Sequence, residues 1–393
     1  MLTTMLMAPA FAGYGDAGVG FPTVRGRQMQ VWVAAARVEP SAFQSDYQAG
    51  GCSFAQFSAS EQSPHEPYRW HAGLADVALE HSIDMRTHNN MIHDSSDGTV
   101  WSVRVGGSYP GWTGIAENIA RGYTSARDTV MRIWMCSSAG HRGSIMSGTY
   151  RHFGGDMDGN YATADFAVGQ ALENRGLRIG AHEPEVPGQT VTFLADWTGA
   201  TPTVIEVVHD GVADPLSLTW GTATQGVWST DLGVDRGACH AYWFRAVSGG
   251  TEVRFPQDGS YSYGTCAGAD PETGWIDAQL GPVVHTQSSP DWTRGQVITF
   301  DVTGGAPGAT IAVVAGTSTG NGPCPAAIGG TCVDLTGTLQ IAAQGVADAN
   351  GHATLQATVP QQLPAGLVVH HQAVAGDGAG DWVVGPILSG TVR

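Results

Sequence analysis

Side chains able to carry out chemistry gather in three short segments of the first half of the chain. Residues 88–94 contain two histidines and an aspartate, residues 116–120 contain a glutamate, and residues 134–142 end in Gly-His-Arg. Imidazole and carboxylate groups bind divalent metals and transfer protons. The segments lie far apart in the sequence, so a common site requires a fold that brings them together.

The order and spacing of these segments resemble the bacterial branch of the CAP superfamily (cysteine-rich secretory, antigen 5 and pathogenesis-related proteins). That branch has a histidine before a polar turn, then a Glu-Asn-Ile-Ala segment, then a tryptophan-led segment ending in Gly-His-Arg, and a closing strand pair. Residues 37–40 and 70–85 also look like the first two helical regions of the family. The resemblance covers residues 25–170 and nothing after about residue 180.

The resemblance implies an α-β-α sandwich with a central cleft, and it assigns His93, Glu117 and His141 to that cleft. Two imidazoles and a carboxylate could hold Zn²⁺ or another divalent cation, or Glu117 could orient a histidine for acid–base catalysis. A third interpretation is structural, with His and Glu hydrogen-bonded across the cleft walls. Many eukaryotic members have a second acidic residue at the position of Ser137. In this chain Asp94 could take the place of that acidic residue.

Members of this family are often not enzymes, and the chain shows no constellation typical of a catalytic nucleophile. The resemblance therefore favours a secreted protein whose cleft binds a lipid, a peptide or a cell-surface glycan, with at most a weakly held divalent metal as cofactor. One alternative is a metal-assisted extracellular hydrolase similar to a peptidase. Another is a structural surface protein with a vestigial cleft.

The charged residues exclude several classes of function. All 18 basic residues are arginines, so Schiff-base lysines, Ser–Lys dyads and P-loop lysines are absent. The formal net charge of −17 argues against binding to nucleic acids and to anionic membrane surfaces, both of which attract clustered positive charge.

Export from the cytoplasm is indicated by two features. Residues 1–12 are mostly apolar and end in Ala-Phe-Ala, which is typical of a signal peptide remnant. Six cysteines without a C-x-x-C motif favour disulfides in an extracellular or cell-surface protein. The simplest pairing places one disulfide in each predicted domain: Cys52–Cys136, Cys239–Cys266 and Cys324–Cys332. No run of about 18 apolar residues occurs elsewhere, so we expect no membrane span.

Hydrophobic periodicity predicts an α+β fold. Spacing of i, i+3, i+4 and i+7 predicts helices over residues 29–36, 74–85 and 126–134, and residues 151–157 and 161–168 read as a hairpin. After a linker at residues 182–188, short alternating strands indicate two β-sandwich modules. The predicted domains are 25–180 (CAP-type α-β-α sandwich), 185–268 and 275–393 (all-β sandwiches).

Overall fold

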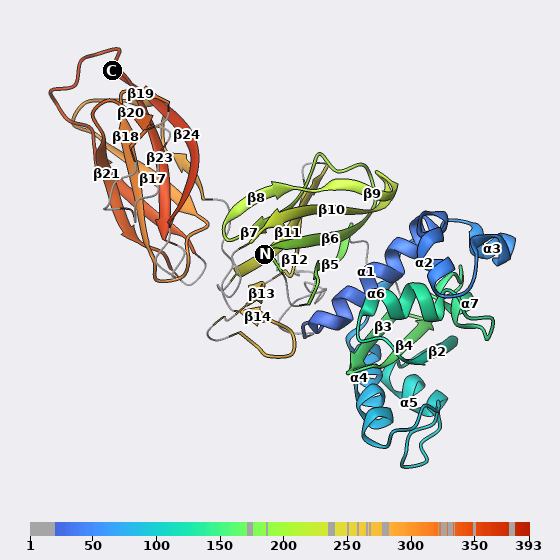
Figure 1. Ribbon diagram of the computed structural model, residues 1–393. Coiled ribbons are helices and arrows are strands. Elements are labelled where there is room, and N and C mark those ends of the chain that lie inside the picture. The colour runs from blue at the N-terminus through green and yellow to red at the C-terminus, as the bar shows by residue number, and fades with distance from the viewer. Residues whose placement is uncertain are drawn as a thin grey trace, which may run out of the picture.

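The computed structural model describes residues 20–393 except 171–175, 186–187, 235–239, 250, 258, 265, 267–268, 277–282, 321, 324–327, 329–332, 334, 349–350 and 377–381. The predicted signal segment and three of the cysteines, Cys239, Cys324 and Cys332, lie outside the described residues. Figure 1 shows three units in chain order: an N-terminal unit of helices around a sheet, a middle sandwich and a last sandwich. The predicted α+β class, with two all-β units after the first, is confirmed.

The three predicted helices are present in the N-terminal unit (residues 20–170). The helical segments are α1 (Val24–Val38), η1 (Pro40–Phe43), α2 (Gln44–Ala49), η2 (Phe54–Gln56), α3 (Ala59–Gln62), α4 (Ala72–Thr87), α5 (Trp101–Ser108), α6 (Ala126–Asp128), η3 (Thr129–Trp134) and α7 (His141–Ile145). The third predicted helix begins as one α-helical turn and continues as the π-helical segment η3. Thr23 caps α1, because its side-chain oxygen accepts a hydrogen bond from the backbone N–H of Gly26.

The sheet of the N-terminal unit has the order β1-β3-β4-β2, which makes β2 an edge strand. Its strands are β1 (Arg69–Trp70), β2 (Gly114–Arg121), β3 (His152–Asp158) and β4 (Tyr161–Val168). The first pair is parallel and the others are antiparallel, and β3 and β4 form the predicted hairpin.

Helices cover both faces of this sheet, as the resemblance implies. A Cβ on Gly154 would lie 2.1 Å from the backbone nitrogen of Ala75 in α4. A Cβ on the next residue, Gly155, would lie 2.7 Å from Sδ of Met29 in α1. Neighbouring residues of a strand point to opposite faces, so α4 and α1 lie on opposite sides of β3.

The middle sandwich consists of two antiparallel sheets with the orders β5-β6-β10-β9 and β14-β13-β11-β7-β8, with β12 paired to β11. Its strands are β5 (Leu177–Glu183), β6 (Thr190–Thr198), β7 (Val204–His209), β8 (Val212–Pro215), β9 (Ser217–Thr222), β10 (Gln225–Gly233), β11 (His240–Ser248), β12 (Thr251–Phe255), β13 (Ser260–Tyr263) and β14 (Trp275–Ile276). The linker prediction is wrong for His182 and Glu183, which belong to β5; His182 is buried against Tyr242 because its imidazole hydrogen-bonds the phenol. At the predicted end of the middle domain, residue 268, the chain has not left this sandwich, because β14 still pairs with β13.

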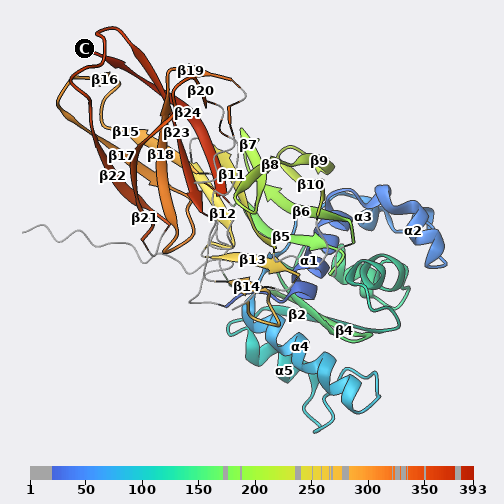
Figure 2. The same ribbon diagram turned by 60° about the vertical axis from the view of Figure 1, so that its left-hand side comes forward.

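The N-terminal unit and the middle sandwich share one hydrophobic core. Both views show α1 lying between the sheet of the N-terminal unit and the strands β5 and β6 (Figures 1 and 2). Trp32 donates a hydrogen bond to Glu183 over 2.9 Å and packs against Trp220. Because α1 is covered on both sides, residues 26–38 are all buried.

The last sandwich has its own core, to which both of its main sheets contribute. Its strands are β15 (Val284–Gln287), β16 (Asp291–Trp292), β17 (Val297–Thr303), β18 (Thr310–Gly316), β19 (Ser318–Thr319), β20 (Leu335–Thr336), β21 (Gln340–Val346), β22 (Ala353–Thr358), β23 (Val368–Gly376) and β24 (Trp382–Val392). Among the described residues, none of the helices has the length and apolar character needed to cross a membrane.

A disulfide joins Cys52 to Cys136, the first pair of the simplest predicted pairing. It ties the segment after α2 to the end of η3, across a sequence separation of 84. Cys266 is also disulfide-bonded.

Candidate functional site

His93 lies in the loop between α4 and α5, and 47% of its side chain is exposed. The loop is held by local hydrogen bonds: Asp94 Oδ1 accepts from the backbone N–H of Trp101, and the N–H of Ser95 donates to the carbonyl of Thr99. Asp94 therefore fixes the start of α5. The imidazole Nδ1 of His93 lies 2.8 Å from Oε1 of Glu117. An ionised carboxylate only accepts, so Nδ1 carries the proton and Nε2 is left for other partners.

Glu117 lies in the middle of the edge strand β2, with 1% of its side chain exposed. Its second oxygen accepts from the guanidinium of Arg104 in α5. The same guanidinium donates to the carbonyl of His93 over 3.0 Å and to Oγ of Ser95 over 2.6 Å. Charge-assisted hydrogen bonds of this kind hold their partners firmly, so Arg104 and Glu117 together fix the orientation of the His93 ring.

Asp165 occupies the position on β4 that pairs with Glu117 on β2, and its side chain is fully buried. Apart from Glu117, its carboxyl oxygens have no hydrogen-bond partner among the described residues. Burial, and next the negative charge of Glu117, raise the pKa of Asp165 well above its usual value. Burial and the neighbouring carboxylate therefore favour the neutral, protonated form of Asp165 beside the Glu117–Arg104 ion pair.

His141 begins the short helix α7, directly after Gly140, whose φ of 103° only glycine adopts easily. The side-chain amide of Asn118 donates to the carbonyl of His141 over 3.0 Å, which attaches α7 to β2 on the face opposite to Glu117. Burial, and next the charge of His93, lower the pKa of His141. Its Nδ1 is buried without a partner in the described part of the chain.

The structure joins two of the three predicted site residues directly, because His93 hydrogen-bonds Glu117. His141 is tied by its backbone carbonyl to Asn118, the neighbour of Glu117 on β2. Among the described residues, the candidate metal ligands whose atoms all lie within 4.8 Å of one another are His209, Asp210 and His240 of the middle sandwich. Ser137, at the position of the second acidic residue in many eukaryotic members, accepts from the N–H of Ala139. Metal binding by His93, Glu117 and His141 stays a prediction.

Arg104 and Asp165 are the site residues that the sequence analysis missed. Asp165 is a lone carboxylate in the otherwise apolar strand of residues 161–168, and that position signals a buried acid. Arg104 gave no comparable signal, because an arginine in a short helix is usually solvated.

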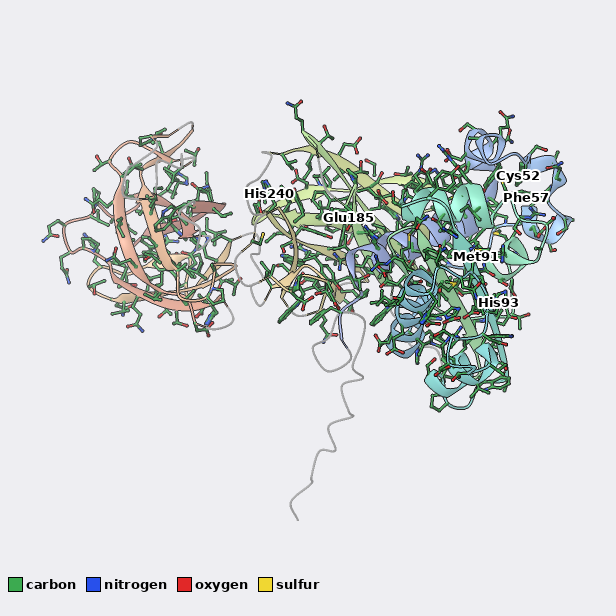
Figure 3. All side chains as sticks on the ribbon, turned by 60° about the horizontal axis from the view of Figure 1, so that its bottom comes forward. Cys52, Phe57, Met91, His93, Glu185 and His240 are labelled. Atoms are coloured by element: carbon green, nitrogen blue, oxygen red, sulfur yellow. A yellow bond between two sulfur atoms is a disulfide. The ribbon has the colours of Figure 1, made fainter. Side chains whose placement is uncertain are left out.

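Exposed apolar side chains adjoin His93 in the sequence. Met91 and Ile92, the two residues before it, have 47% and 44% of their surface exposed. Val100 and Val103, at the start of α5, have 46% and 66% exposed. Figure 3 labels Met91 and His93 near each other in the N-terminal unit. We call these four residues the apolar rim.

The comparisons that bear on the candidate site concern the N-terminal unit. Residues 61–170 match the model of the cysteine-rich secretory protein family, CAP. An extracellular protein of Bacillus anthracis that contains an SCP domain is 27% identical over 25% of this chain and 33% of its own, with a TM-score of 0.24. A cysteine-rich secretory protein of Staphylococcus aureus is 16% identical over 33% of this chain and 38% of its own, with a TM-score of 0.23.

An outer surface protein of Borrelia burgdorferi is 19% identical over 26% of this chain and 78% of its own, with a TM-score of 0.23. This chain thus spans about a third of the Bacillus and Staphylococcus proteins and about three quarters of the Borrelia protein. A search of curated proteins found no match.

Proposed function

Residues 61–170 form a CAP domain, and from this premise we propose that the chain is an extracellular binding protein whose CAP domain holds an amphipathic lipid at His93. One observation carries the proposal: an exposed imidazole is fixed by a buried Glu117–Arg104 pair and directly follows two exposed apolar side chains. A polar head group and an apolar tail are the two chemistries that such a surface recognises together.

The head group would meet Nε2 of His93. With Nδ1–H bonded to Glu117, the neutral ring offers a lone pair to a hydroxyl donor, and the protonated ring offers N–H to an anionic oxygen. The site therefore suits a head group that carries a hydroxyl or a single negative charge.

The tail would cover the apolar rim. Large apolar side chains that are half exposed lose contact with water when a tail lies on them. Removal of about 100 Å² of apolar surface from water contributes about 2.5 kcal/mol to binding. A glycan would leave these side chains without a partner, which is why a lipid is favoured over a glycan.

The location outside the cytoplasm is supported by the disulfide between Cys52 and Cys136. Disulfides persist in oxidising compartments and are rare in the cytosol. The two β-sandwiches would then act as spacer or adhesion units that hold the CAP domain away from its attachment point.

A divalent metal is a second candidate ligand for the same residues. A carboxylate that accepts from Nδ1–H of a histidine, whose Nε2 then binds the metal, is a common outer-sphere arrangement in metal sites. His93 and His141 would be the ligands, and Glu117 would orient His93 without touching the metal. Because both oxygens of Glu117 are already engaged, it is poorly placed as a general base, and this favours binding over the hydrolase alternative.

A fluorescent fatty acid tests the lipid proposal. We expect the full-length, disulfide-bonded chain to bind a dansylated fatty acid, and His93→Ala and the double variant Met91→Ser/Ile92→Ser to weaken binding at least tenfold. Val346→Ser is the matched control, because Val346 is 63% exposed but lies in the last sandwich. Equal affinity in all variants, or no binding by the unsubstituted chain, would overturn the proposal.

A further inference from the structure

A second cluster of metal-binding side chains lies in the middle sandwich, outside the CAP domain. His209 ends β7, Asp210 follows it in the turn to β8, and His240 begins the neighbouring strand β11. One candidate ligand atom from each of the three lies within 4.8 Å of the other two. The sequence analysis did not single out these residues, since they are 30 positions apart and meet only because β7 pairs with β11.

The distances are close to those of a bound ion. Oδ2 of Asp210 lies 2.6 Å from Nδ1 of His240 and 3.5 Å from Nε2 of His209. Ligands of a tetrahedral zinc ion at about 2.0–2.1 Å lie about 3.3 Å apart. The His209 contact already has that length, and the His240 contact must lengthen by about 0.7 Å. A proton now joins Asp210 and His240, and a cation would take the place of that proton.

The backbone holds Asp210 in position. Its φ is 49°, a left-handed conformation that few residues other than Gly, Asn and Asp adopt readily. The backbone N–H of Asp210 donates to the carbonyl of Ala241, and Oδ1 accepts from the N–H of Ala241, both over 2.8 Å. Oδ1 thus anchors the side chain to β11, and Oδ2 is directed at both histidines.

The imidazoles are held as firmly as the carboxylate. The rings of His209 and His240 stack with centroids 5.2 Å apart, and Phe193 packs against His209. Each histidine side chain is 11% exposed and that of Asp210 is 38% exposed, so the carboxylate side of the cluster is open to solvent. An ion can enter from there while the rings stay fixed.

The nitrogen of His209 that faces Asp210 already has a polar partner. The phenol oxygen of Tyr263 lies 2.7 Å from Nε2 of His209. In the metal-free protein this O–H donates to the ring, and on metal binding it can turn to Asp210 or to a bound water.

We propose that His209, Asp210 and His240 bind one divalent transition-metal ion of the zinc class, with water in the fourth position. Two nitrogen ligands and one carboxylate suit zinc, whereas Mg²⁺ and Ca²⁺ require mostly oxygen ligands. The site is independent of the proposed function of the CAP domain.

The site lies on the side of the middle sandwich nearest the last sandwich, where Figure 3 shows His240. A Cβ on Gly211, the residue after Asp210, would lie 2.8 Å from the side chain of Val383 in β24. A bound ion would therefore stiffen the turn against which the last sandwich packs.

Zinc titration of the full-length His93→Ala/His141→Ala variant tests this site without interference from the CAP domain. We expect calorimetry to show one Zn²⁺ per chain, unaffected by millimolar Mg²⁺. Adding Asp210→Asn should weaken binding at least tenfold, and asparagine keeps the left-handed backbone. Asp214→Asn, which removes a neighbouring carboxylate of β8, is the matched control and should change affinity less than threefold.

Cobalt provides a test that needs no substitution at the site itself. Co²⁺ added to the His93→Ala/His141→Ala variant should give the visible absorption of a four-coordinate ion with nitrogen and oxygen ligands, and Zn²⁺ should displace it. Absence of Zn²⁺ binding in this variant, a six-coordinate cobalt spectrum, or unchanged affinity in a folded Asp210→Asn chain would each overturn the proposal.

Discussion

The carboxyl groups of Glu117 and Asp165 occupy paired positions on β2 and β4, both buried, with Arg104 as the cation beside them. Two carboxylates this close cannot both stay ionised away from water, so the pair shares one negative charge. That charge matches the single guanidinium of Arg104. The His93 ring is therefore supported by an electrically balanced group of three side chains.

Asp165→Asn should flatten the pH dependence of stability. The pKa of Asp165 is raised well above 3.8 in the folded state, so the folded chain keeps a proton that the unfolded chain releases. The stabilisation that the Asp165 carboxyl contributes is fully present below about pH 4. It declines as the pH rises toward the pKa of Asp165 in the folded state. Urea unfolding from pH 4 to 8 should show a shallower decline for Asp165→Asn than for the parent. Asp301→Asn, at an exposed site of the last sandwich, should run parallel to the parent; a parallel curve for Asp165→Asn would contradict the prediction.

Glu117→Gln should be tolerated only while Asp165 is present. When Glu117 loses its charge, Asp165 can ionise and pair with Arg104, so we expect a loss below about 2 kcal/mol. Glu117→Gln/Asp165→Asn leaves the guanidinium of Arg104, which is 9% exposed, without a counter-charge and should cost about 3–5 kcal/mol. The free energy of unfolding in urea measures both losses, and adding Arg104→Met to the double variant should restore part of the stability. Strictly additive losses would show that the two acids do not share a charge.

The sequence was sufficient for the parts of the fold that depend on periodicity and motif. The helix over residues 74–85 shows a 3.6-residue repeat, and the hairpin at residues 151–168 combines two alternating runs with a glycine turn, so both are found as α4 and as β3 with β4. His182 was assigned to a linker because it stands before a proline-rich stretch. Only the structure reveals that Tyr242, 60 residues later, buries it.

The candidate site could be predicted only in part for the same reason. His93, Glu117 and His141 were found through a family pattern, which fixes residue types at positions but not their contacts. The ion pair of Arg104 with Glu117, the facing Asp165, and the meeting of His209 with His240 all depend on strand pairing and helix packing between distant segments. No local pattern in the chain encodes such contacts.

Removal of the Cys52–Cys136 disulfide should destabilise the N-terminal unit by about 4 kcal/mol. The disulfide closes a long loop in the unfolded chain, and the unfolded chain gains entropy when that loop is opened. Cys52→Ser/Cys136→Ser is the variant to compare with the parent in urea unfolding. Reduction of the parent with dithiothreitol should lower its stability by at least this amount, because it also reduces the disulfide of Cys266. A double variant as stable as the oxidised parent would show that packing alone holds the segment after α2.

Arg27→Met should weaken the N-terminal unit and the middle sandwich together. Arg27 is fully buried in α1, donates to the carbonyls of Pro22 and Thr273 over 2.7 Å each, and lies 3.5 Å from the ring centre of Tyr261. Methionine fills the space but leaves the two carbonyls without donors, which should cost about 3 kcal/mol. Since both units share one core, calorimetry should show a single transition for them that moves to lower temperature, while the transition of the last sandwich stays in place.

Arg25→Met is the matched control, because its ion pair with Glu185 is partly exposed and should contribute less than about 1 kcal/mol. Two separate transitions for the first two units, only one of them shifted, would mean that the shared core does not couple them.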